Sequence, residues 1–164
     1  MKVGVLSDTH IPGRGKQIPK AVWEGLQDVD LIIHCGDIAA GFVLDRLREI
    51  APVEAVYGNT DPFDLKQELP KTKVLRLGDF DLGIVHGDGS RATIDNAFGA
   101  FPFIELDCIL FGHSHVPFIG KREGILMFNP GSPTDKRMQE KYSFGLLHVG
   151  KELRAELVFF SSKA

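Results

Sequence analysis

The sequence is poor in cysteine. Among its 164 residues only Cys35 and Cys108 occur, and each lies inside an apolar run. Two separated cysteines do not make the disulfide framework of a small secreted domain, and their apolar surroundings favour buried free thiols. We therefore expect a protein of a reducing compartment whose hydrophobic core holds the fold without cross-links.

The sequence also lacks an excess of positive charge and any long apolar segment. Nineteen basic residues stand against 22 acidic ones, a formal net charge of −3, whereas proteins that wrap a nucleic acid present a basic face. The opening MKVGVLSDTH carries one lysine and is interrupted by Asp8, unlike a signal peptide. No run approaches the roughly 20 apolar residues of a membrane span. These shortages predict a cytoplasmic protein with no extended nucleic-acid partner and no membrane partner.

The chain does contain short apolar runs that alternate with helical patterns. Residues 18–26, 43–50 and 94–101 carry apolar side chains at helical spacing, the first behind Pro19 and the last behind Thr93 as a predicted N-cap. Runs that are apolar at both odd and even positions are typical of strands buried on both faces, as in parallel sheets. These runs cover residues 3–6, 31–33, 53–57, 82–85 and 108–111.

The remaining patterns indicate antiparallel strands. Residues 73–85 predict a hairpin around Gly78 and Asp79, and residues 125–128, 143–149 and 153–159 predict a strand-rich C-terminal part. A chain of this length fits one domain, residues 1–164. The predicted fold class is α/β, with a mixed sheet or two stacked sheets and helices outside.

Each of the buried strands is followed directly by polar residues that can bind a metal. Since the loops beyond the carboxyl ends of the strands line one crevice in an open α/β sheet, we expect these residues to converge. On a strand, side chains two positions apart point the same way, so His113 and His115 should both face the crevice while Ser114 points away. The candidate ligands after the five runs are Asp8 and His10, Asp37, Asn59, His86, and His113 and His115.

The residue types indicate a particular metal chemistry. Two carboxylates, four imidazoles and an amide oxygen suit Mn²⁺, Fe²⁺, Ni²⁺ or Zn²⁺ better than a thiolate-rich zinc site or an all-oxygen calcium site. Seven ligands are too many for one tetrahedral ion. They suit two ions that share a carboxylate about 3.5–4 Å apart, the arrangement that clamps both oxygens in a phosphoryl transfer.

Taken singly, these residues have ordinary explanations. An isolated aspartate such as Asp8 is more often an N-cap or turn residue, and Asn59 after a glycine is a turn signal. Only their repeated place after strands favours a ligand role. Two other histidines are interpreted differently, His34 as a structural or supporting residue and His148 as a surface or packing residue.

The series D-T-H, G-D, G-N-T-D, H-G and G-H-S-H, in this order over residues 8–115, resembles the calcineurin-like metallophosphoesterase family. It is most similar to the small bacterial and archaeal phosphodiesterases of that family, and N-P-G-S at residues 129–132 is a further shared element. The resemblance covers nearly the whole chain. It implies a four-layer αββα sandwich, with two mixed β-sheets packed face to face and helices outside.

The resemblance also implies roles for individual residues. A metal-bridging hydroxide would attack the phosphorus of a phosphate diester, or also of a monoester, while the ions offset the charge of the transition state. Asp37, Asn59 and His86 would act through the metals and the phosphate, with Mn²⁺ as the first candidate metal. One ion would be held by Asp8, His10 and His115, a second by Asn59, His86 and His113, and Asp37 would bridge them.

The chain departs from the family pattern on the substrate side. Many relatives have a histidine, the usual candidate for protonating the leaving group, where this chain has Thr60, and Asp88 stands where another histidine often follows H-G. Asp61 or a metal-bound water are substitutes for the missing acid. Asn59, Thr60 and Arg14 are candidate substrate contacts, although Arg14 also suits a solvated loop charge.

Two functions follow from the resemblance. The leading hypothesis is a metal-dependent phosphodiesterase that acts on a small phosphate ester, with homo-oligomerisation left open. The alternative is a protein-interaction scaffold, because the same fold is shared with the metallophosphoesterase-like subunit of retromer, whose role is chiefly protein binding. A nuclease is disfavoured by the small size and the lack of a basic face.

Overall fold

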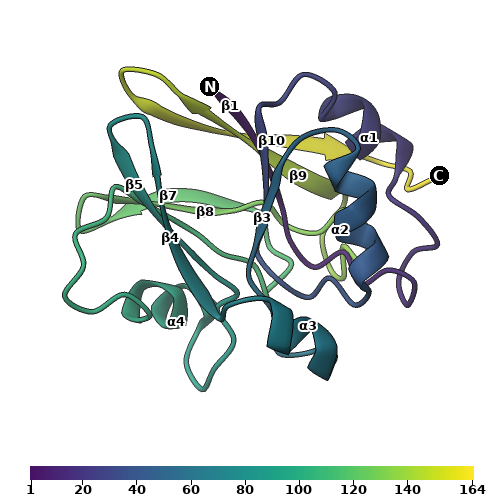
Figure 1. The fold of residues 1–164 in the computed structure, drawn as a ribbon, viewed down its shortest axis with the longest axis horizontal. Coiled ribbons are helices and arrows are strands. Elements are labelled where there is room, and N and C mark those ends of the chain that lie inside the picture. The colour runs from purple at the N-terminus through teal and green to yellow at the C-terminus, as the bar shows by residue number, and fades with distance from the viewer.

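The computed structural model describes residues 1–164 as two five-stranded mixed sheets with helices on their outer faces (Figure 1). In the first sheet the order is β10-β9-β1-β2-β3, and in the second it is β4-β5-β6-β8-β7. The strands are β1 (Lys2–Leu6), β2 (Leu31–His34), β3 (Val53–Ala55), β4 (Thr72–Leu77), β5 (Phe80–Val85), β6 (Cys108–Leu110), β7 (Phe118–Arg122), β8 (Ile125–Asn129), β9 (Tyr142–Val149) and β10 (Leu153–Phe160).

Each sheet contains three adjacent parallel strands, which lie at one side of the first sheet and in the middle of the second. In the first sheet β1, β2 and β3 are parallel, and β9 and β10 add on antiparallel. In the second sheet β5, β6 and β8 are parallel, and β4 and β7 are antiparallel edge strands. Parallel neighbours end at the same edge of a sheet, so the loops after them are brought together.

Four helices complete the layers. They are α1 (Lys20–Gly25), α2 (Gly41–Arg48), α3 (Phe63–Glu68) and α4 (Thr93–Gly99). Figure 1 shows α1 and α2 together at one side of the molecule and α4 at the other. None of the four is long and apolar enough to cross a lipid bilayer.

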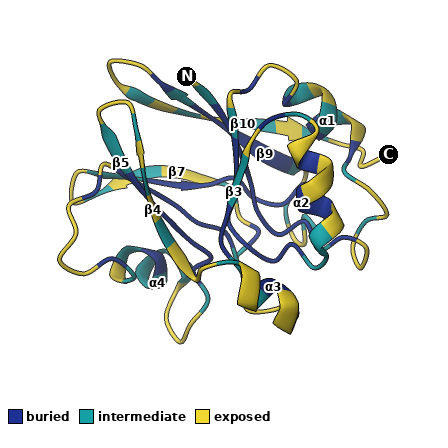
Figure 2. Ribbon diagram, viewed as in Figure 1, coloured by how far each residue is buried: buried dark blue, intermediate teal, exposed yellow.

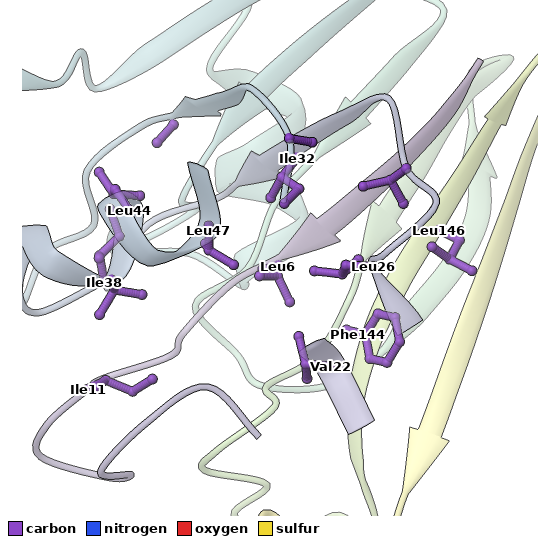
Figure 3. Packing of buried hydrophobic residues seen from close by; sticks show 14 of the residues in the cluster. Leu6, Ile11, Val22, Leu26, Ile32, Ile38, Leu44, Leu47, Phe144 and Leu146 are labelled. Carbon is purple, nitrogen blue, oxygen red and sulfur yellow. The ribbon is translucent and has the colours of Figure 1, made fainter. Parts of the chain in front are cut away.

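The buried apolar residues form three clusters that correspond to the three interfaces of the sandwich. One packs α1 and α2 on the first sheet, and its members include Val22, Leu47 and Phe144 (Figure 3). A second fills the space between the sheets, and the third packs α4 on the second sheet. Successive residues of a strand belong to different clusters. In β2, for example, Ile32 faces the helices and Ile33 faces the other sheet. Figure 2 shows the central strands buried, the edge strands partly exposed and the outer helix faces exposed.

The predicted strands and helices are present, with differences at their edges. The predicted hairpin is β4–β5, paired from Thr72 with Val85 to Leu77 with Phe80. Thr93 is not an N-cap: α4 begins at Thr93, and the residue before it, Ala92, makes no capping bond through its side chain. Helix α3 and strand β7 were not predicted. Both are short, and β7 is largely exposed, so neither has the continuous apolar pattern of the central strands.

Candidate metal centre

Strained backbone turns direct the candidate ligands toward one another. Asp8, His10, Asp37, His113 and His115 all have positive φ angles, of 57°, 43°, 57°, 67° and 61°. For residues other than glycine this left-handed conformation is uncommon, and such strain of about 1–3 kcal/mol per residue persists mainly at functional sites. Five of the seven predicted ligands therefore lie in turns that the surrounding structure must hold in place.

The first group consists of Asp8, His10 and His115. Asp8 Oδ1 lies 3.5 Å from His115 Nε2 and 3.8 Å from His10 Nε2. All three atoms are buried and have no hydrogen-bond partner. Buried polar atoms are nearly always paired, because an unpaired one costs about 1–3 kcal/mol. Three such atoms that face one another are the arrangement a cation would satisfy, so this group fits a metal ion.

The second group consists of Asp37, His86 and His113. His86 Nε2 lies 3.1 Å from Asp37 Oδ2 and 3.3 Å from His113 Nδ1. His86 Nδ1 donates to the Cys35 carbonyl at 2.8 Å, because a carbonyl can only accept. The other ring nitrogen, Nε2, is thus left with its lone pair available when the ring is neutral. This is the usual arrangement of a metal-binding histidine.

Asp37 connects the two groups. Its Oδ2 atom lies 3.6 Å from His10 Nε2 of the first group and 3.1 Å from His86 Nε2 of the second. Its other oxygen, Oδ1, accepts a hydrogen bond from the Thr60 amide at 3.0 Å. One carboxylate oxygen is therefore fixed by the backbone and the other faces both groups.

Asn59 is the one predicted ligand outside the two groups. It is exposed, and its backbone carbonyl accepts a hydrogen bond from Lys66 Nζ at 3.1 Å. The residues on either side of Asn59 are hydrogen-bonded to carboxylates near the site. The Gly58 amide donates to Asp61, and the Thr60 amide donates to Asp37. The backbone thus holds Asn59 beside the second group, while its side chain makes no hydrogen bond with that group.

Charge in the metal-free centre is balanced by protons. Burial would lower the pKa of His86, but hydrogen bonding to Asp37 and the charges of Asp8 and Asp37 raise it to about 9. Burial would raise the pKa of Asp37, but the same contact with His86 holds it below its ordinary value. The pKa of His113 is lowered by burial and by His86. A proton on His86 therefore compensates the carboxylates where a cation would otherwise do so.

The segment that follows β8 was missed as a part of the site. His115 Nδ1 donates to the Asp135 carbonyl at 2.6 Å, which directs Nε2 into the first group. Ser132 Oγ donates to the Asp8 carbonyl at 2.8 Å, and Asn129 Nδ2 donates to the Gly112 carbonyl at 3.0 Å. The N-P-G-S element thus ties two ligand loops together. The sequence signal was present, as polar residues following a strand that pairs with β6.

Asp61, the predicted substitute acid, is bonded to the backbone of the site. Its carboxylate accepts hydrogen bonds from the amides of Asp37, Ile38, Ala39 and Gly58, at 2.8–3.0 Å. These donors occupy both carboxylate oxygens. Asp61 thus joins the loop that carries Asp37 to the turn that carries Asn59.

The expectation that His113 and His115 lie on a strand is wrong. Strand β6 ends at Leu110, and both histidines lie in the following loop with left-handed backbone. Their side chains belong to different groups, His113 to the second and His115 to the first. Ser114 belongs to neither group, because its hydroxyl oxygen accepts hydrogen bonds from Asn129 Nδ2 and the Val116 amide.

Two glycines allow the loops to approach the ligands. A Cβ atom on Gly58 would lie 2.1 Å from Asp37 Oδ1, and one on Gly112 would lie 1.8 Å from Ser7 Oγ and 2.7 Å from Asp8 Oδ2. All three distances are shorter than the contacts that real Cβ atoms make. Only glycine fits at these positions.

The other singled-out residues lie at the periphery. The Arg14 side chain is 68% exposed, and its Nε lies 3.5 Å from Asp135 Oδ2, beside His115. Thr60 is exposed next to Asp37. His148 pairs with Glu156 at 2.9 Å on the outer strands, as expected for a surface residue.

Comparisons with known proteins show the family of the chain. Residues 1–152 match the family model described as calcineurin-like phosphoesterase superfamily domain. A probable metallophosphoesterase of Methanocaldococcus jannaschii is 40% identical over 163 residues, which is 96% of this chain and 81% of that protein.

Solved structures share the fold over the whole chain. A novel archaeal phosphodiesterase superposes with a TM-score of 0.72 at 25% identity, covering 96% of this chain and 100% of the other. Vps29 of Entamoeba histolytica, in a complex with zinc, superposes with a TM-score of 0.75 at 25% identity, covering 97% and 99%.

Proposed function

Since the chain belongs to the calcineurin-like phosphoesterase superfamily, we propose that it is a metal-dependent phosphodiesterase that hydrolyses small phosphate diesters and also monoesters. The observation that carries this proposal is the first group, in which three buried atoms of Asp8, His10 and His115 face one another without hydrogen-bond partners. Six of the seven proposed ligands fall into the two groups, and Asp37 of the second group also lies close to His10 of the first.

Two divalent ions are proposed to bind, one in each group, with Asp37 shared and Asn59 completing the second. The mixture of imidazole and carboxylate ligands favours Mn²⁺, with Ni²⁺, Fe²⁺ and Zn²⁺ as alternatives. Bound divalent ions lower the pKa of a coordinated water, supply a nucleophile and offset the charge of the phosphate in the transition state. The protein side chains supply the geometry, and the half-buried His10 and His113 lie on the side of the centre that a substrate can reach.

The leaving group is proposed to depart without a protein acid. Thr60 stands in the place of the expected histidine, and the carboxylate of Asp61 is occupied by backbone amides. Esters with good leaving groups should therefore react fastest. Arg14 is the proposed side-chain contact for the substrate phosphate, because it lies beside His115 and is open to solvent.

The substrate is proposed to be a small molecule rather than an extended nucleic acid, given the net charge of −3. The two cysteines are buried free thiols, which suits the reducing cytoplasm that we propose as the location.

An interaction scaffold on the same fold is the alternative function. Its support is the structural similarity to Vps29. Because the two functions make opposite predictions about turnover, one experiment separates them.

That experiment is an activity screen of the purified protein. Hydrolysis of bis-p-nitrophenyl phosphate and of a panel of mono- and diesters is measured with Mn²⁺, Ni²⁺, Fe²⁺ or Zn²⁺, with EDTA and the His113→Ala variant as controls. We expect metal-dependent turnover of the diester that EDTA abolishes. Absence of turnover on the whole panel, together with no bound metal by elemental analysis and a stable stoichiometric partner, would favour the scaffold.

A further inference from the structure

One buried histidine has no part in the proposed metal centre. His34 is the last residue of β2 and is fully buried. Its Nδ1 atom lies 3.1 Å from the Gly36 amide and its Nε2 atom lies 3.0 Å from Thr9 Oγ1. Both ring nitrogens thus have partners, and both partners lie in loops that carry candidate ligands.

The direction of these hydrogen bonds follows from their chemistry. The Gly36 amide can only donate, so His34 Nδ1 must accept and carry no proton. The proton of the neutral ring is then on Nε2, which donates to the Thr9 hydroxyl oxygen. That hydroxyl can in turn donate to the Ile38 carbonyl at 3.4 Å. The three bonds form one relay in which every donor has an acceptor.

The surroundings keep His34 neutral. Burial lowers its pKa to about 4, although the nearby carboxylates of Asp61, Asp8 and Asp37 act in the opposite sense and His86 acts in the same sense as burial. A second proton would sit on Nδ1 and face the Gly36 N–H. The relay therefore keeps one direction throughout the neutral pH range.

Thr9 is the residue through which His34 can act on the centre. It lies between Asp8 and His10, both of which have left-handed backbone. The Thr9 side chain is buried and turned toward His34, whereas Asp8 and His10 face each other in the first group. Its second partner, Ile38, directly follows the shared ligand Asp37.

We propose that His34 is a positioning residue for the candidate metal centre: by anchoring the Thr9 hydroxyl against the Ile38 carbonyl, it holds Asp8 and His10 in the orientation that binds the first ion. The loops already share backbone bonds, from the Asp8 amide to the Gly36 carbonyl and from the His10 amide to the Asp37 carbonyl. These backbone bonds fix the distance between the two loops. The relay in addition fixes the orientation of the Thr9 side chain, and with it the directions in which Asp8 and His10 point. The inference rests on the proposed function because it takes the first group to bind a metal.

The test compares Thr9→Ser with Thr9→Ala. The two variants lose the same methyl group, so they differ only in the hydroxyl oxygen that the relay needs. Mn²⁺ binding to the metal-free proteins is measured by calorimetry, and melting temperatures are measured in parallel. Residues that orient metal ligands typically contribute 10–100-fold to metal affinity. For one of the two Mn²⁺ binding steps, the affinity of Thr9→Ala should therefore be about 10-fold weaker than that of Thr9→Ser. A purely structural role would lower the melting temperature of Thr9→Ala and leave its Mn²⁺ affinity equal to that of Thr9→Ser, which would overturn the proposal.

A second measurement examines the relay without metal. Nitrogen-15 NMR of the metal-free protein should show His34 as a neutral ring with its proton on Nε2 from pH 5.5 to 8.5. A proton on Nδ1, or a charged ring in this range, would overturn the proposal. Wild-type protein that binds Mn²⁺ but hydrolyses no ester would contradict the phosphodiesterase function and leave the positioning role intact, whereas absence of Mn²⁺ binding would overturn both.

Discussion

Asp8 Oδ1 and His115 Nε2 lie 3.5 Å apart in the interior, and neither has a hydrogen-bond partner in the protein. Asp8 Oδ2, in contrast, accepts hydrogen bonds from Ser7 Oγ and from the His113 amide, at 2.8 and 2.9 Å. One oxygen of this carboxylate is therefore fixed by the protein and the other is left for a ligand. A divalent cation would supply the missing interaction, and this relationship underlies the predictions about metal.

Metal should stabilise the fold measurably. A ligand that binds only the native state at 100 times its dissociation constant adds about 2.7 kcal/mol to the free energy of unfolding. For a domain of this size that corresponds to roughly 5–10 °C in melting temperature. Thermal unfolding followed by circular dichroism, with Mn²⁺ and with EDTA, checks this shift. Equal melting temperatures under both conditions would contradict a metal site in the first group.

Without metal, the protein should lose stability as the pH rises. His86 has a pKa raised to about 9 from an ordinary value of 6.5, so the folded state holds a proton that the unfolded state releases. The stabilisation is complete below about pH 6.5 and is lost as the pH rises through 9, a change of about 3 kcal/mol. His10, whose pKa is also raised, acts in the same sense. Urea unfolding at pH 6 and pH 9, with EDTA present, measures the loss.

The His86→Gln variant is the control for this pH dependence. Because glutamine does not titrate, the difference in stability between pH 6 and pH 9 should shrink in the variant. Apparent Mn²⁺ affinity of the wild type should increase over the same range, since the proton on His86 must leave before metal binds. Stability that instead rises toward pH 9 would show that His86 is neutral in the folded protein.

Gly58→Ala should disable the centre. The added Cβ would lie 2.1 Å from Asp37 Oδ1 and 2.5 Å from the Asp37 amide nitrogen, so the shared carboxylate must move. Displacement of a shared ligand should reduce turnover at least 100-fold. Gly99→Ala, at the last residue of α4, is the matched control because its Cβ meets nothing within 4 Å. Equal turnover of both variants would argue against Asp37 as a ligand.

Asp61→Asn should damage stability rather than proton transfer. Its amide nitrogen cannot accept, so at least one of the buried backbone N–H groups now bonded to Asp61 loses its partner. The expected cost is about 2–4 kcal/mol in the free energy of unfolding. Asp45→Asn, on the exposed surface of α2, should change it by less than about 0.5 kcal/mol. A stable Asp61→Asn protein with a shifted pH–rate profile would restore Asp61 as the acid.

Much of the fold could be predicted from local patterns. The central strands are buried on both faces, so their apolar runs are continuous and mark them clearly, as for Cys108–Leu110. The presence of two sheets could not be derived from those runs, because pairing depends on contacts distant in sequence, and it came from the family resemblance. Strand β7 and helix α3 are short and partly exposed, so tertiary contacts decide them.

For the site, the sequence predicted which residues converge but not how they are held. The place of Asp8, Asp37 and His86 after strands was a sufficient signal because parallel strands end at one edge. The supporting roles of Asp61 and Asp135 depend on backbone groups that no sequence pattern displays. The left-handed turns at His113 and His115 were missed for a similar reason: histidine adopts positive φ more often than most residues, but such turns are still uncommon and no sequence pattern marks them.

The central claim is that two ions in these two groups together hydrolyse a phosphate diester. Its most direct test is the rate of bis-p-nitrophenyl phosphate hydrolysis as metal-free protein is titrated with Mn²⁺, with the bound metal measured at each step. We predict that turnover increases as the second equivalent binds and that His115→Ala loses at least one equivalent together with the activity. No turnover with two Mn²⁺ bound, or full turnover in the presence of EDTA, would contradict the claim.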